Sequence, residues 1–65
     1  MLQPHQQRVV AELEELNARL DKLALFIIEN PKFKEIDPLE QRRMRRQLAV
    51  MLGYSVVLTE RIEAF

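Results

Sequence analysis

Two runs of side chains, spaced alternately four and three residues apart, dominate this chain of 65 residues. The first run consists of Val9, Leu13, Leu16, Leu20, Leu23 and Ile27. The second consists of Met44, Leu48, Met51, Ser55, Leu58, Ile62 and Phe65. This spacing is that of the heptad repeat, which lines one face of a helix with the side chains that pack against a second helix. The pattern therefore predicts two long helices, each with one packing seam.

Prolines and a capping residue indicate where these helices start and stop. Pro4 fits a first helical turn, where the missing N–H would have no intrahelical partner. Asn30 precedes Pro31 and is therefore driven out of helical geometry. Asp37 is expected to cap the second helix, and Glu40 to reach back to it as in a capping box. The expected elements are a helix over about residues 4–29, a connection over residues 30–37 anchored by Phe33 and Ile36, and a helix over about residues 38–64.

Two long helices with a short link must fold back on each other. The expected fold is therefore all-α, an antiparallel two-helix hairpin that forms one domain over residues 1–65. Chains this short rarely bury enough apolar surface to fold alone and use disulfides, metals or partner chains instead. Because the chain has no cysteine and one histidine, association of copies into a helical-bundle oligomer is the remaining expectation.

Apolar residues outside the two seams support this expectation. They are Val10, Ala24, Leu25, Phe26, Ile28, Val50, Leu52, Tyr54, Val56 and Val57. A hairpin partner covers only one side of a helix, so the others would form an exposed apolar patch. Leu52 and Val56, one turn apart, are candidates for a face between chains. Gly53 costs about 1 kcal/mol relative to Ala in a helix, which suggests close approach of another backbone, with neutral drift as the alternative.

Composition and motifs exclude several classes of function. Ten basic and ten acidic side chains cancel, so bulk charge predicts no generic affinity for nucleic acid or membranes. No apolar stretch approaches the roughly 20 residues of a membrane span, and the start lacks a signal-peptide layout, so a soluble cytoplasmic protein is expected. No phosphate loop, paired-histidine motif or nucleophile–base set is present, so we expect no enzyme, cofactor or metal. Ser55, within a seam, is expected to bond a carbonyl one turn back or to mark the helix register.

One charged run stands out, and it allows two interpretations. It consists of Arg42, Arg43, Arg45 and Arg46, in the first half of the second expected helix. A solvated face, paired with acidic residues of neighbouring chains, is the simpler interpretation. The alternative is a phosphate-binding site, since guanidinium groups match phosphate oxygens in geometry. In that case the protein would be a helical bundle that binds nucleic acid. The zero net charge favours the solvated face.

A second polar group is expected at the open end of the hairpin. An antiparallel arrangement brings together Pro4, His5, Gln6, Gln7, Arg8, Thr59, Arg61 and Phe65, with Tyr54 about two turns away. Hydrogen-bond donors, a stacking ring and positive charge are what a nucleotide ligand requires. The alternative, which the residues alone favour, is that Gln6 and Gln7 are solvent-facing helix formers and that Tyr54 is a core residue with its hydroxyl at the edge.

The same residues carry a family resemblance over essentially the whole chain. They are the stretch Leu2-Gln3-Pro4-His5-Gln6-Gln7-Arg8-Val9-Val10, then Phe26-Ile27, Phe33, Gln47-Leu48, Met51, Tyr54, Leu58, Arg61-Ile62 and Phe65. This pattern resembles very small phage proteins with the helical hairpin shared by the phage anti-CBASS sponge, the second type named, and the Thoeris anti-defence sponge. The Pro-His-Gln-Gln-Arg opening and the closing Tyr-to-Arg-Ile pattern are its specific parts.

The resemblance implies a non-enzymatic binding protein in the cytoplasm of an infected bacterial host. Such sponges are homo-oligomers, typically hexamers, that hold cyclic dinucleotides between protomers or cyclic trinucleotides near three-fold axes without cutting them. Arg61 resembles the family arginine that meets trinucleotide phosphates. The other expected ligand-binding residues are Pro4, His5, Gln6, Arg8 and Tyr54. A ligand-free assembly or adaptor module and, less favoured, an Arg-rich nucleic-acid-binding bundle remain the alternatives.

Overall fold

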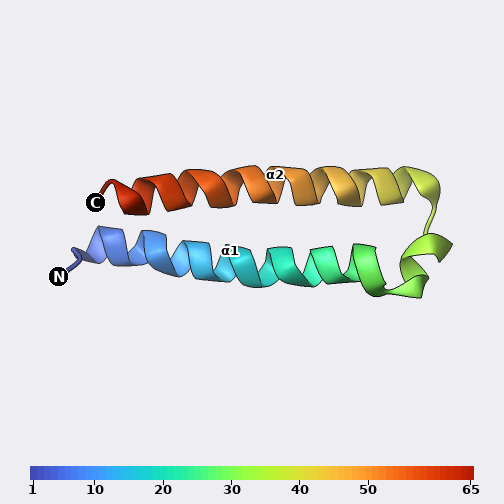
Figure 1. Cartoon of the computed structure of the whole chain (residues 1–65), viewed down its shortest axis with the longest axis horizontal. Coiled ribbons are helices and arrows are strands. Elements are labelled where there is room, and N and C mark those ends of the chain that lie inside the picture. Colours follow the sequence, from blue (N-terminus) through green and yellow to red (C-terminus); the bar gives the residue numbers. More distant parts are fainter.

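The computed structural model describes all residues 1–65 and contains two long helices side by side (Figure 1). Helix α1 spans Pro4–Glu29, the short 3₁₀ helix η1 spans Pro31–Glu35, and α2 spans Pro38–Glu63. The chain reverses at η1, so both termini lie at the same end of a rod of 48 × 15 × 13 Å. The predicted all-α two-helix hairpin is therefore confirmed. No helix combines the length and the apolar character needed to cross a bilayer.

The core of the hairpin is the contact between the two heptad seams. Val9, Leu16 and Leu58 are buried, and Leu58 is only 1% exposed. The half-buried side chains that pack against this cluster are Leu13, Met51 and Ile62. Every member of the cluster belongs to one of the two runs with alternating spacing, so the spacing identified the packed faces correctly.

One polar contact fixes how the helices are aligned along each other. The Ser55 hydroxyl donates a hydrogen bond to Asn17 Oδ1 at 3.0 Å, and no other side-chain hydrogen bond joins α1 to α2. The expected alternative, a bond to a carbonyl one turn back, is made by Thr59, whose hydroxyl donates to the Ser55 carbonyl at 2.9 Å. Because a slip of either helix would break the bond to Asn17, Ser55 marks the register, as predicted.

At the turn end of the hairpin, two aromatic side chains pack against each other. Phe33 in η1 is only 2% exposed, and its ring meets that of Phe26 edge-on at 6.1 Å between centroids. The guanidinium of Arg45 lies 5.2 Å from the Phe33 ring centroid, a cation–π geometry. Ile36 is half-buried beside it. Phe33 and Ile36 therefore anchor the connection, as the sequence predicted.

The start of α2 confirms one local prediction and corrects another. Asp37 caps the helix, its carboxylate accepting a hydrogen bond from the Leu39 N–H at 3.2 Å. Glu40 was expected to reach back to the cap, and this is wrong, because its Oε1 accepts from Arg43 Nε at 2.6 Å instead. A charged guanidinium one turn further along the helix is a stronger donor than a neutral backbone N–H.

The last member of the second seam is not buried. Phe65 is 42% exposed, although its spacing from Ile62 continues the heptad pattern. The reason is that α2 ends at Glu63, with Ala64 as its C-cap. Phe65 lies beyond the helix and leaves the stripe that faces α1.

Much apolar surface stays in contact with solvent in a single hairpin. Only four of the 65 residues are buried, whereas Ile28 is 76% exposed and Val50 is 67% exposed. The accessible surface is 5232 Å², compared with about 4,300 Å² for a compact monomer of 7.7 kDa. The excess of roughly 900 Å² is close to the ~800 Å² that one partner contributes to a standard protein interface.

Candidate ligand-binding site

The open end of the hairpin brings the first turns of α1 beside the last turns of α2 (Figure 1). Val9 belongs to the same core cluster as Leu58 and Ile62. Their chain neighbours Arg8 and Arg61 therefore lie at the same level along the rod, and both are exposed. Two positive side chains from opposite ends of the sequence thus lie at one end of the molecule.

Tyr54 and Arg61 share one side of α2. They are seven residues apart, which is nearly two full turns and about 10 Å along the axis. Tyr54 is 43% exposed, so the alternative interpretation as a core residue is wrong for the single chain. Arg61 forms no ion pair, and it lies in the last turn of α2, where the helix dipole favours a cation. Both groups are accessible from solvent.

Gln6 and Gln7 have a structural role that their sequence pattern did not reveal. Gln6 Oε1 accepts a hydrogen bond from the Gln3 N–H at 2.9 Å, and Gln7 Nε2 donates to the Leu2 carbonyl at 3.0 Å. These bonds satisfy backbone groups before the first turn of α1, as a capping box does. Gln7 is exposed in α1, so its interpretation as a solvent-facing helix former is confirmed, whereas Gln6 is half-buried and that interpretation is wrong for it.

The remaining predicted residues of α1 differ in what they offer a ligand. Pro4 is the first residue of α1 and is exposed. With no N–H, Pro4 can present only its ring and its carbonyl. His5 and Arg8 are also exposed, and neither side chain takes part in a hydrogen bond or ion pair within the chain. Their donors are therefore free.

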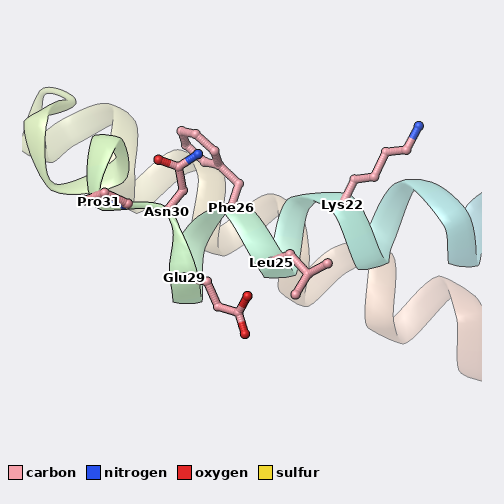
Figure 2. A pocket seen from close by; sticks show the side chains of 6 residues that line it. All are labelled: Lys22, Leu25, Phe26, Glu29, Asn30 and Pro31. Carbon is pink, nitrogen blue, oxygen red and sulfur yellow. The ribbon is translucent and has the colours of Figure 1, made fainter.

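The six predicted residues do not enclose a cavity within one chain. Only Gln6 among them is even partly buried, and no side-chain hydrogen bond joins any two of them. The one concavity of the surface, about 540 Å³, lies at the opposite end, lined by Lys22, Leu25, Phe26, Glu29, Asn30 and Pro31. Figure 2 shows that the side chains around it point in different directions, with the Lys22 ammonium pointing away from the turn.

The arginine run on α2 is partly engaged in contacts within the chain. Arg43 forms the single ion pair of the structure, with Glu40, and Arg45 stacks on Phe33. Arg42 and Arg46 are exposed. The four guanidinium groups therefore do not act as one uniform cationic surface. No three His, Asp or Glu side chains gather in a group that could hold a metal ion.

The cap on α1 yields a prediction for Gln6. Gln6→Ala removes the acceptor for the Gln3 N–H and should lower the free energy of unfolding by about 0.5–1 kcal/mol. Gln6→Glu retains an acceptor oxygen and places a negative charge at the helix N-terminus, where it is favourable, so it should keep or raise stability. Urea unfolding of the three proteins tests this. Equal destabilisation by Ala and Glu would contradict the capping role.

A helical hairpin with free cationic groups at its open end, and with an exposed tyrosine about two turns further along α2, fits a small phage protein of the sponge type. The chain belongs to the Sequestin family, whose family model matches residues 3–64. This membership confirms the resemblance noted from the sequence, and the family name indicates sequestering of a ligand. The comparisons with curated proteins and with solved structures gave no match.

Proposed function

We propose that this chain is a non-enzymatic phage sponge, which binds cyclic oligonucleotide immune signals and withholds them from their effectors without cleaving them. The observation that carries the proposal is the match of a family named for sequestration over residues 3–64. The signals would be cyclic dinucleotides, cyclic trinucleotides or both, encountered in the cytoplasm of an infected bacterial host. The working form would be a homo-oligomer, with a hexamer as the expected size.

The chemistry of the open end suits such a ligand. A cyclic oligonucleotide presents phosphates, which need positive donors, and bases, which need flat apolar partners. Arg61 and Arg8 would supply the positive donors, and Tyr54 would supply the ring. His5 and the free amide N–H groups of Gln6 would add hydrogen bonds to phosphate or sugar oxygens. Because all these groups lie on the surface of a thin rod, a second copy would supply the opposite wall of the pocket.

The proposed mechanism is mass action. A protein that binds the signal tightly, and is present above the signal concentration, lowers the free signal below the level that its effector needs. No covalent step is required. The groups needed are binding groups, and the ligand leaves the protein as it entered.

Thermal unfolding with a ligand panel tests this proposal. Cyclic dinucleotides and trinucleotides, each at about a hundredfold above its Kd, should raise the melting temperature by on the order of 10 °C. The linear dinucleotide of the same sequence is the matched control and should raise it far less. The ligand recovered after heat denaturation should be intact by mass spectrometry. Unchanged melting across the panel, or recovery of a cleaved ligand, would contradict the proposal.

The exposed apolar side chains favour a second candidate, an assembly or adaptor module without a small ligand. Ile28 and Val50 are each more than two-thirds exposed, which association alone would explain. Such a module would form the same assembly but show no shift in melting with any cyclic nucleotide. A nucleic-acid-binding bundle would instead bind linear RNA or DNA with a steep salt dependence, lost when Arg42, Arg43, Arg45 and Arg46 become Gln.

A further inference from the structure

The face of α2 that points away from α1 is apolar, although it is exposed. Counted from the buried seam, Gly53 occupies heptad position f, which is farthest from the packed positions a and d. The outer α2 face consists of Ala49, Val50, Gly53, Val56 and Val57, all exposed. Val50, Val56 and Val57 are 67%, 56% and 53% exposed. Small and β-branched side chains therefore form a continuous apolar strip around Gly53, opposite the hairpin seam.

Charged residues flank this strip at equal distances from Gly53, with opposite signs at the two ends. Arg46 lies seven residues before Gly53, and Glu60 lies seven residues after it. Because seven residues make nearly two turns, these three positions lie along one line of the helix. Arg43 and Glu63 repeat the arrangement ten residues to either side. The outer face thus has a basic end, an apolar centre and an acidic end.

We propose that the outer α2 face is a two-fold interface between copies of this chain, with the helices antiparallel and the axis passing at Gly53. A two-fold contact pairs positions that are equidistant from its axis. It places Arg46 opposite Glu60 of the partner subunit, and Val50 opposite Val56 of the partner subunit. A parallel contact would instead place Arg46 opposite the partner's Arg46. The charge pattern therefore selects the antiparallel orientation, as complementary charges do at interfaces.

Gly53 lies where this contact brings two helices closest together. In the single chain, a side chain at Gly53 would meet no atom within 4 Å apart from its chain neighbours and the backbone of its own helix, so the hairpin itself does not require glycine there. At the centre of a two-fold contact the same residue of both copies meets, and the absence of side chains lets the helix axes approach. Packing two hairpins in this way places the two α2 helices side by side at the centre, with one α1 on the outer side of each, so that helix packs on helix throughout the assembly.

The amount and location of the exposed surface agree with a partner of this kind. The excess of the 5232 Å² surface over that of a compact monomer of equal mass is close to what one side of a standard interface buries. Arg46 and Glu60 have no ion-pair partner within their own chain, since Arg43 and Glu40 form the single pair. This inference deepens the proposed association of copies and does not depend on which ligand binds.

Charge reversal tests the interface. Arg46→Glu alone and Glu60→Arg alone each place like charges opposite each other twice per dimer. Each should raise the dissociation constant of the assembly by roughly tenfold, measured by sedimentation of the whole chain. The double variant with both changes restores opposite charges with the signs exchanged. The dissociation constant of this double variant should be within about threefold of that of the original chain. The inference is overturned if the double variant loses as much affinity as the two single variants combined, or if neither single variant changes the dissociation constant.

Gly53→Leu provides a second test that does not depend on charge. The open surroundings of Gly53 accept a leucine in the single hairpin, and leucine is a better helix former. Far-UV circular dichroism, recorded at a protein concentration at which the variant is assembled, should therefore show full helix content. Association should nevertheless weaken by more than about tenfold. Unchanged association of this variant would overturn the inference. If the original chain assembles while all these variants behave like it, another face is used, and the ligand panel still decides the proposed function separately.

Discussion

Replacing Leu58 with Ala should lower the free energy of unfolding by about 2–5 kcal/mol, the cost of emptying a buried leucine site. Leu58 is the most deeply buried leucine of the hairpin, at 1% exposed, and it packs in the seam with Val9 and Leu16. A chain of this length has a total stability of roughly 3–10 kcal/mol. The change should therefore leave much of the protein unfolded at micromolar concentration, as measured by urea titration with circular dichroism.

Leu39 gives a matched control for this prediction. Leu39→Ala deletes the same atoms from a side chain that is 59% exposed near the start of α2. Its effect should stay within about 0.5 kcal/mol, as for most surface substitutions. If Leu39→Ala costs as much as Leu58→Ala, the seam is not the main stabilising contact of the hairpin.

Replacing Arg61 with Gln should weaken binding of the cyclic oligonucleotide by roughly tenfold to a hundredfold. A hydrogen bond to a charged group contributes about 1.5–3 kcal/mol, and each 1.4 kcal/mol is a factor of ten in Kd. The helix content should not change, because Arg61 is exposed and forms no ion pair within the chain. Isothermal titration calorimetry measures the loss directly, using a cyclic ligand that raises the melting temperature of the original chain.

Lys34 provides the charge-matched control for Arg61. It is exposed in η1, at the turn end of the rod, so Lys34→Gln removes the same unit of charge far from the candidate site. Binding should stay within about twofold, since an exposed charge that far away is screened by salt. Equal losses for both variants would show that overall charge, and not the open end, determines affinity.

The packing of the hairpin could be predicted from sequence because it depends on a repeated pattern. Many seam positions specify the same two faces, so a local departure such as Ser55 does not disturb the result. Proline and Asp37 determine where the helices begin and end, because each strongly restricts or caps the local backbone, and both can be identified directly in the sequence. The antiparallel arrangement then follows from the short connection between two long helices.

Local hydrogen bonds were harder to predict because they depend on choices between similar partners. Glu40 could accept from the cap or from Arg43, and the difference is on the order of 1 kcal/mol. Gln6 caps α1 through Gln3, which is not among the residues favoured at an N-cap. Such a pattern gives little sequence signal, so the role of Gln6 became visible only from the 2.9 Å contact.

The candidate site was predictable as a neighbourhood but not as a pocket. The antiparallel hairpin necessarily brings Arg8 and Arg61 to one end, and both are exposed there. In the proposed site a second copy supplies the opposite wall of the pocket. The sequence of one chain therefore does not define the shape of the pocket or the ligand that fits it. The outer α2 face was visible in the sequence as excess apolar residues, but its charge symmetry about Gly53 emerged only when the packed seam fixed which positions face outward.

The most direct test of this account follows mass and helix content together upon dilution. Sedimentation should give a mass that is a multiple of 7.7 kDa at high concentration, and helix content should fall as dilution splits the assembly, because a lone hairpin exposes too much apolar surface. Added cyclic oligonucleotide should lower the protein concentration at which half of the assembly has split, since binding sites shared between copies favour the assembled state. A fully helical single chain that persists at nanomolar concentration would contradict the account.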